Sequence, residues 1–164
     1  MSKIHLRFEE TREYEKFTSI LNDLTEDLGN AFPVSIQAWC GLAQRNYPLL
    51  DWHVFLAIQP SGCIGLYSHY RQPDDPDQRF WVGWIGVSPA FRRQGVGSML
   101  LQHIEHTALL QGHGEIWVYT DNTKAMTFYE ANGYQVIGGF PRDTLRQNAA
   151  NNASVVLKKT MPGI

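Results

Sequence analysis

The stretch that most constrains the fold is RRQGVG at residues 92–97, where an apolar strand is followed by a helix. Before it, the apolar run FWVGWIGV at residues 80–87 is closed by Ser88 and Pro89. After it, apolar residues recur close to the i, i+3, i+4, i+7 spacing of a helix with one buried face. A helix N-terminus carries backbone N–H groups without partners and the positive end of the helix dipole. Two glycines let a ligand approach that backbone and two arginines add charge, so this stretch predicts a pyrophosphate site.

The spacing of the glycines separates the classes of phosphate site. A Walker motif needs Lys followed by Ser or Thr after its second glycine, and the chain has neither there. The dinucleotide fingerprint G-x-G-x-x-G would need glycine at position 100, which is Leu100. The stretch instead resembles R-x-x-G-x-G, a signature of the GNAT superfamily of acyl-CoA-dependent N-acyltransferases. A glycine-rich turn with solvated arginines is the alternative interpretation of this motif taken alone.

A second motif follows downstream. Residues 114–120 (GEIWVYT) are typical of a short buried strand, and residues 121–123 (DNT) can cap a helix over residues 124–132. The sequence resembles the second GNAT signature, N-x-x-A-x-x-F-Y-E-x-x-G-F/Y, at Asn122, Ala125, Phe128, Tyr129, Glu130, Gly133 and Tyr134. With both signatures in this order, the chain is identified as a member of the GNAT superfamily.

Hydrophobic patterns predict one α/β domain over residues 1–164, without repeats or a long linker. Strands are expected at residues 4–8, 53–59, 63–71, 80–87, 114–120, 135–138 and 154–159, and helices at residues 11–28, 35–45, 96–111 and 124–132. Thr11 and Ser35 are expected to cap the first two helices, and Gly29 to end the first. This order matches the GNAT layout, which implies a mixed central β-sheet flanked by helices on both faces.

Composition excludes several classes of function. A formal net charge of −2 argues against a general binder of nucleic acid or of membrane surfaces. The two cysteines, Cys40 and Cys63, have no C-x-x-C spacing, which favours free thiols in a reducing compartment. The first residues lack the apolar segment of a signal peptide, and no run approaches the length of a membrane span. The expected location is cytoplasmic.

The resemblance implies where acetyl-CoA binds. In the family, the strand before the glycine motif and the strand after the next helix run parallel and splay apart, and acyl-CoA enters the gap. The pantetheine arm would pair with the backbone of Ile85, Gly86 and Val87, with the thioester carbonyl polarised by an amide near Val87. Amides near the helix start and the side chain of Arg92 or Arg93 would hold the pyrophosphate. The residues supplying these amides are Gln94, Gly95, Val96, Gly97 and Ser98.

Two further roles come from the resemblance. Asn122 would hydrogen-bond the pantetheine or anchor the loop that does so. Tyr129 would give a proton or a hydrogen bond to the leaving CoA thiolate, its alternative role being packing alone. Some family members carry a glutamate before the glycine motif that accepts the amine proton, but residues 80–87 contain no carboxylate. Candidate bases near the mouth are Asp51, His53, Tyr119 and Asp121, and a water chain would need none of them.

The six histidines do not predict a metal site. His103 and His106 share a helix face without acidic or cysteine partners, so we expect solvated side chains there. His5, His53 and His69 are expected at the surface or at a sheet edge. The five tryptophans are expected to fill the core, or, for Trp39, Trp81 and Trp84, to line an acceptor pocket that favours an apolar, aromatic or cationic amine.

Substrate choice in the superfamily resides mainly in the two-helix segment, here residues 24–51, and in the loop between the last strands, here residues 141–153. That loop is polar and carries two arginines, which suit a carboxylate, a peptide backbone or solvent alone. The leading hypothesis is acetyl transfer from acetyl-CoA to a primary amine of a small molecule. The alternatives are acetylation of a protein N-terminus or lysine, and a non-catalytic acyl-CoA-binding module. A homodimer is left open.

Overall fold

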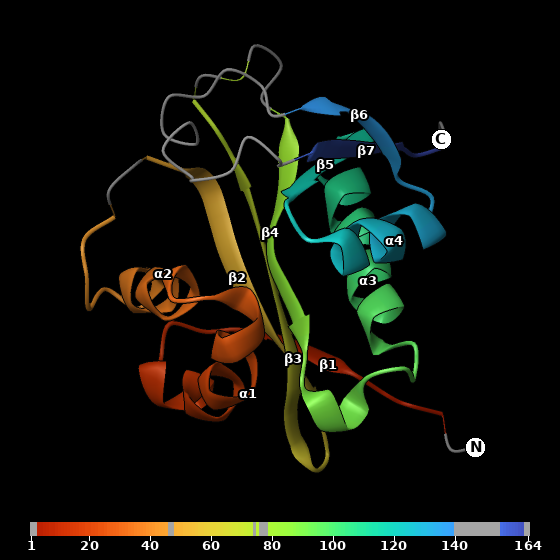
Figure 1. Cartoon of the computed structure of the whole chain (residues 1–164). Helices are drawn as coiled ribbons and strands as arrows, with labels where there is room; N and C mark the ends of the chain where they lie inside the picture. The colour runs from red at the N-terminus through yellow and green to blue at the C-terminus, as the bar shows by residue number, and fades with distance from the viewer. Residues whose placement is uncertain (1–2, 46–47, 74, 76–78, 140–154, 163–164) are drawn as a thin grey trace.

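The computed structural model describes residues 3–45, 48–73, 75, 79–139 and 155–162. Its seven-stranded sheet has the order β1-β2-β3-β4-β5-β7-β6, with α1 and α2 on one face and α3 and α4 on the other (Figure 1). The strands are β1 (Arg7–Glu10), β2 (Leu50–Gln59), β3 (Gly62–Arg71), β4 (Phe80–Val87), β5 (Glu115–Thr120), β6 (Gln135–Gly139) and β7 (Val155–Thr160). The helices are η1 (Tyr14–Phe17), α1 (Thr18–Leu28), α2 (Ala31–Trp39), η2 (Pro89–Phe91), α3 (Val96–Leu110) and α4 (Thr123–Ala131). The predicted mixed sheet with helices on both faces is confirmed.

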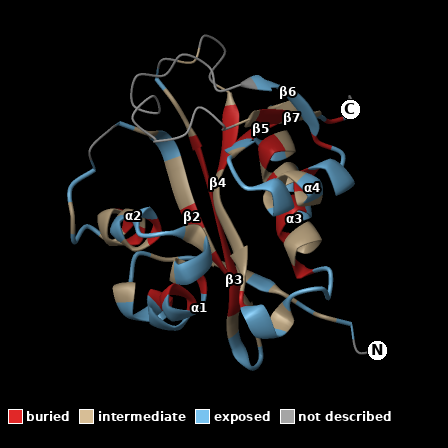
Figure 2. Ribbon diagram, in the orientation of Figure 1, coloured by how far each residue is buried: buried red, intermediate tan, exposed pale blue. Residues whose placement is uncertain are grey.

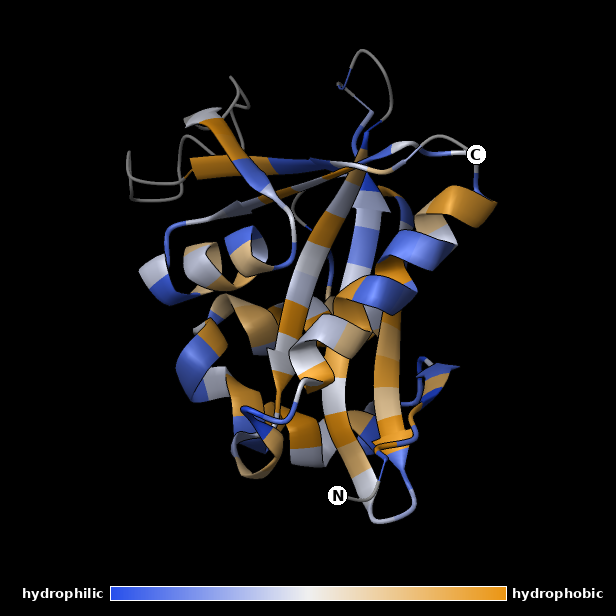
Figure 3. Cartoon of the chain, turned by 90° about the vertical axis from the view of Figure 1, so that its right-hand side faces the viewer, coloured by the Kyte–Doolittle hydropathy of each residue, from blue (hydrophilic) through white to orange (hydrophobic). Residues whose placement is uncertain are grey.

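Two apolar layers hold the helices against the sheet. On one face, α3 buries Leu100, Leu101 and Ile104 against the strands. On the other, α1 and α2 bury Ile20 and Phe32 among neighbouring apolar side chains. Each such side chain contributes about 1.5–3 kcal/mol when it leaves water. Buried residues lie in the central strands and on the inward helix faces (Figure 2), and the helix ribbons alternate between hydrophilic and hydrophobic bands (Figure 3).

The N-terminal boundaries differ from the prediction. The first strand covers Arg7–Glu10 instead of residues 4–8, and the helix expected from residue 11 begins as the 3₁₀ turn η1 at Tyr14. Thr11 does not cap a helix, because its Oγ1 accepts a hydrogen bond from the Glu13 amide at 3.1 Å, within a turn. Gly29 ends α1 with φ of 88°, as expected.

The second helix was predicted too late in the sequence. It begins at Ala31 because Pro33 is tolerated in a first turn, where its missing N–H has no helical partner to lose. Ser35 therefore lies inside α2 and does not cap it. Gly41 takes φ of +80° just after the helix, and Leu42, which lies inside the predicted helix of residues 35–45, is 64% exposed. A left-handed glycine at this position is a common helix stop.

No helix among the described residues has the length and apolar character needed to cross a membrane. The predicted substrate loop at residues 141–153 lies outside the described residues, as does residue 154 of the last predicted strand.

Candidate active site

The two central parallel strands separate soon after they meet. β4 and β5 pair in parallel at Phe80 with Ile116 and at Trp81 with Trp117. Beyond Trp81, β4 continues to Val87 with register partners on β3 alone among the described strands. Figure 1 shows β4 running down past the point where β5 leaves it. The resulting gap exposes one edge of β4, as the resemblance implied.

The register shows which backbone groups face the gap. Val87 pairs with Gly65 and Ile85 pairs with Tyr67, and the Ser88 amide donates to the Ile64 carbonyl at 2.8 Å. In an antiparallel ladder, alternate residues direct their N–H and C=O toward the partner strand. Ser88 and Gly86 therefore point toward β3, whereas Ile85 and Val87 point into the gap. Pairing of Ile85 and Val87 with a pantetheine arm stays a prediction that this register supports.

Gly86 has a packing role that the resemblance did not imply. Its backbone groups face β3, and a Cβ at this position would lie 2.7 Å from Cδ1 of Leu24 on α1. The absence of a side chain lets α1 pack directly on β4. We therefore assign Gly86 to packing.

A β-bulge bends β4 where the gap begins. The register shifts between Tyr67 and His69, so Ser68 alone faces Gly83 and Trp84. The Trp84 amide donates to Ser68 Oγ at 2.7 Å, and a Cβ on Gly83 would lie 2.3 Å from the same oxygen. Bulges bend and twist a strand, and this bend accounts for the departure of β4 from β5. The sequence analysis missed this feature, although a glycine inside an apolar strand is its usual signal.

The glycine loop (residues 92–98) connects β4 to α3 through two left-handed residues. Arg93 has φ of 61° and Gly95 has φ of 80°, and no side chain caps α3. The Met99 amide bonds to the Gly95 carbonyl at 3.1 Å, so helical hydrogen bonding starts there. The amides of Val96, Gly97 and Ser98 precede that first bond and have no helical acceptor. Such a helix start suits an anionic group.

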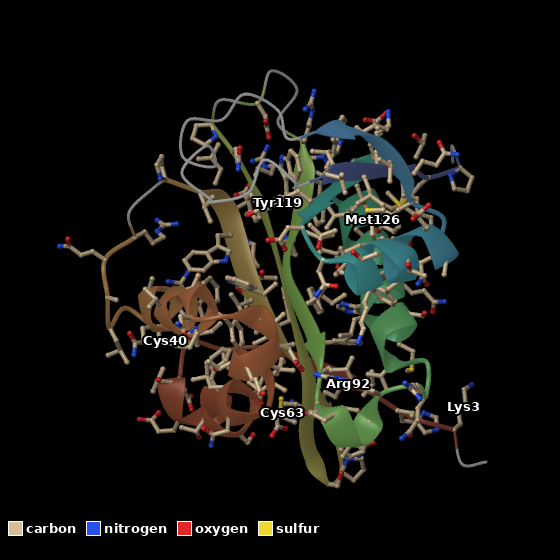
Figure 4. The ribbon with its side chains drawn as sticks, viewed as in Figure 1. Lys3, Cys40, Cys63, Arg92, Tyr119 and Met126 are labelled. Carbon is tan, nitrogen blue, oxygen red and sulfur yellow. The ribbon has the colours of Figure 1, made fainter. Side chains whose placement is uncertain are left out.

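Arg92 is held by the protein itself. Its Nε donates to the Val87 carbonyl at 2.9 Å, and its Nη2 forms an ion pair with Asp27 on α1. Figure 4 shows Arg92 beside the lower end of β4. Arg93 is exposed and has no ion-pair partner among the described residues. Of the two arginines left open by the sequence, Arg93 therefore has the guanidinium available for a phosphate.

Comparison with known proteins agrees with this geometry. The model of the acetyltransferase (GNAT) family matches residues 14–134. The chain belongs to the GNAT family. Its fold resembles a protein of Desulfovibrio desulfuricans assigned to that family, with a TM-score of 0.73 and 13% identity over 95% of this chain and 99% of the other.

Two further solved structures share the fold of this GNAT protein. A GNAT family acetyltransferase from Elizabethkingia anophelis with acetyl-CoA bound has a TM-score of 0.64 and 15% identity, covering 97% of this chain and 100% of that one. An aminoglycoside 6′-acetyltransferase of type Ii has a TM-score of 0.67 and 16% identity, covering 96% of this chain and 99% of that one.

The second signature places α4 next to the glycine loop. Asn122 caps α4, because its Oδ1 accepts hydrogen bonds from the Lys124 amide at 2.8 Å and the Ala125 amide at 3.2 Å. The structure shows Asn122 as the cap of α4, and its role toward the pantetheine stays a prediction. A Cβ on Gly97 would lie 3.0 Å from the Phe128 ring, so this glycine permits contact between α3 and α4. The sequence analysis had assigned Gly97 to ligand approach alone.

Tyr129 is a buried residue on α4. It is 3% exposed, and its ring lies 5.3 Å from that of Phe128 and 5.6 Å from that of Tyr134. Burial raises the pKa of Tyr129, so the phenol keeps its proton at neutral pH. This protonation state is the one that a donor to a thiolate requires.

The four candidate bases lie in two places. Asp51 and His53 are on β2, where Asp51 pairs with Arg71 and His53 Nδ1 lies 2.6 Å from Glu10 Oε1. Tyr119 and Asp121 lie at the end of β5, beside the gap, with Tyr119 38% exposed. Figure 4 places Tyr119 near the level at which β4 and β5 separate. The fold therefore brings the second pair to the gap and leaves the first pair two strands away from β4.

The expectation for His69 was wrong. His69 is 2% exposed, and its Nε2 has no hydrogen-bond partner among the described residues. Burial, with a smaller contribution from His53, lowers the pKa of His69 to about 3. His103 is also not a solvated residue, since its Nδ1 lies 2.6 Å from the Tyr67 hydroxyl and its ring stacks on Phe8 at 3.8 Å. Across the described part of the chain, no cluster of three or more His, Cys, Asp or Glu side chains is arranged to hold a metal ion.

Proposed function

We propose that this GNAT protein transfers the acetyl group of acetyl-CoA to a primary amine of a small molecule. The observation that carries the proposal is the exposed edge of β4, where Ile85 and Val87 direct backbone groups into the gap beside β5. An extended amide-containing chain can pair with such an edge as a missing strand would. The acetyl-CoA bound in the Elizabethkingia anophelis relative supports this choice of donor.

The same residues suggest how the donor is oriented. The pantetheine arm would pair with Ile85 and Val87, and the pyrophosphate would accept from the amides of residues 96–98 and from Arg93. Arg92 would position the loop by linking Val87 to Asp27. The pyrophosphate and the thioester would then be fixed at opposite ends of the exposed edge.

The transfer step follows from ordinary acyl chemistry. A neutral amine attacks the thioester carbon, a C–N bond forms, and the C–S bond breaks with its electron pair leaving on sulfur. Tyr129 would donate a hydrogen bond or its proton to that thiolate. An ammonium substrate loses one proton before attack, the acylated nitrogen loses a second as the C–S bond breaks, and β4 contains no carboxylate to accept either. Water reaching the open end of the gap, directly or by way of Tyr119 and Asp121 beside it, would receive these protons.

Two measurements test the proposal. Titration calorimetry should show acetyl-CoA binding to the wild-type protein, and CoA release should be observed with at least one member of a panel of small amines. Short peptides with free N-termini and lysines belong in the same panel, because faster turnover of these would favour protein acetylation. A folded protein that does not bind acetyl-CoA would refute the donor, and binding without turnover of any amine would favour an acyl-CoA-binding module.

A further inference from the structure

A second cavity lies on the α1/α2 face of the sheet, apart from the glycine loop. Its volume is about 360 Å³, and it opens between α2 and β2. The residues lining it are Arg12, Ala38, Trp39, Arg45, Leu49, Asp51, Trp52 and His53. None of these belongs to the exposed edge of β4 or to the start of α3. The acetyl-CoA site proposed above therefore leaves this cavity unused.

The charges around the cavity do not cancel. Asp51 is paired with Arg71, and Glu10 on the neighbouring strand contacts His53 Nδ1 through its Oε1 at 2.6 Å. Arg12 and Arg45 have no carboxylate partner among the described residues. Three guanidiniums thus stand against two carboxylates around the cavity, which keeps a net positive charge. Such an arrangement favours an anion.

Aromatic rings hold both guanidiniums in place. The Arg12 guanidinium carbon lies 4.1 Å from the centre of the Trp39 ring, and that of Arg45 lies 5.4 Å from the Trp52 ring. Trp39 is itself fixed, since its Nε1 donates to the Thr11 carbonyl at 2.6 Å. A stacked guanidinium keeps its N–H donors free at the edge, and their planar fork matches a carboxylate. The cavity therefore presents prepositioned donors for a carboxylate.

Apolar rings connect this cavity to the gap. Trp52 packs with the cluster of Tyr70, Trp81 and Trp117, which come from β3, β4 and β5. Trp81 and Trp117 form the last parallel pair before the two strands separate. Neighbouring strands lie about 4.8 Å apart, so roughly 10–12 Å separates β2 from the middle of the gap. These rings are buried, so an acceptor would run along the rim of their cluster, and a molecule of that length spans the distance.

We propose that the cavity at Arg12 and Arg45 binds the carboxylate of the amine acceptor, whose amine reaches the gap between β4 and β5. This inference rests on the proposed acetyl transfer and specifies its substrate class. The acceptor is an elongated amino acid in which the amine and the carboxylate are separated by about 10 Å of largely apolar chain. Polyamines are disfavoured, because a second cationic end would meet two unpaired guanidiniums.

A series of acceptors of graded length tests the inference in the wild-type protein. The probes are glycine, γ-aminobutyrate, ε-aminocaproate and ω-aminocaprylate, each compared with the carboxamide of the same chain. We expect kcat/KM to rise with length, and the two longer carboxylates to exceed their amides about tenfold. Equal rates for carboxylates and amides would overturn the inference and leave acetyl transfer standing. Acetylation of none of the probes, amides included, would also overturn the inference, and turnover of other members of the amine panel would then show that acetyl transfer stands.

Variants locate the effect in the cavity. Arg12→Gln and Arg45→Gln should each reduce the preference for ε-aminocaproate over its amide by about 3- to 5-fold, and the double variant should abolish it. Arg7→Gln is the matched control, because it removes the same charge from an exposed position on β1. The KM for acetyl-CoA reports that each variant is folded. A preference that persists in the double variant, or that Arg7→Gln reduces equally, would place the anion elsewhere.

Discussion

At the scale of single residues, the site depends on side chains whose partners come from distant parts of the chain. Sequence patterns could place Tyr129 on α4 and Asn122 at its start because both belong to one contiguous motif. They could not show that Arg92 is held by Asp27, since these residues are far apart in the sequence and meet through the packing of α1. The same reason hides the stacking of Arg12 on Trp39. Local motifs are thus predictable, whereas contacts that depend on tertiary packing are not.

Tyr129 can be tested against a matched tyrosine. Tyr129→Phe removes the hydroxyl and keeps the ring, so we expect kcat to fall on the order of 10²-fold with little change in acetyl-CoA affinity. Tyr134→Phe is the control, because Tyr134 is also buried and its hydroxyl has no partner among the described residues. Steady-state kinetics of both variants distinguishes a proton donor from packing. Similar losses in the two would assign Tyr129 to the core.

At the scale of elements, patterns succeeded where a helix or strand has one clear signal at each end. The start of α3 at Val96 and the extent of β4 agree with the prediction to the residue. The bounds predicted for α2 were wrong because Pro33 is compatible with an earlier start of the helix and Gly41 with an earlier end. The bulge in β4 was missed because its partner, Ser68, lies on another strand. Hydrophobic periodicity describes one element at a time, whereas the register of a sheet depends on the pairing of two strands.

Two glycines at the ends of α3 allow a controlled test of the glycine loop. Gly95 precedes α3 with φ of +80°, Gly112 follows it with φ of +84°, and a Cβ at either position would meet no atom within 4 Å. Replacing either by Ala forces a side chain into the left-handed region, at a cost of about 1 kcal/mol in the free energy of unfolding. We expect similar thermal destabilisation from Gly95→Ala and Gly112→Ala, but weaker acetyl-CoA binding from Gly95→Ala alone. Calorimetry of the two variants makes the comparison. Equal affinities for acetyl-CoA would show that the glycine loop does not bind it.

At the scale of the whole molecule, the fold was predictable and its interior electrostatics were not. Two short signatures and the order of the elements sufficed for the mixed sheet with helices on both faces. Alternation of polar and apolar residues suggested that His69 lies at the surface, but α3 covers the face to which it points. A strand buried on both faces shows no alternation to distinguish them.

Buried His69 should make the protein sensitive to acid. Its pKa is about 3 in the folded chain against 6.5 for the free side chain, so below pH 6.5 the unfolded state binds a proton that the folded state does not. Stability is therefore unaffected by this group above pH 6.5 and falls as the pH drops, by about 2 kcal/mol at pH 5. His69→Phe should remove this part of the loss of stability, measured by urea unfolding at pH 5 and above pH 6.5. His106→Gln, at an exposed position of α3, should leave it unchanged, and an unaltered pH slope in His69→Phe would contradict the assignment.

The parting of β4 and β5 also divides the molecule mechanically. Strands β1 to β4 are joined in chain order, and β5, β7 and β6 form a second group, with two parallel register pairs linking them. Acetyl-CoA lying along Ile85 and Val87 would bridge the two groups of strands. The two groups would then open together when the ligand is bound, so the cooperativity of opening would depend on ligand occupancy. Amide hydrogen exchange at these two residues should slow when acetyl-CoA is added, together with exchange along β5. Protection confined to the glycine loop would show that the halves open independently of the ligand. In the unliganded protein, the junction of β4 and β5 is then both the least connected part of the sheet and the binding site for acetyl-CoA.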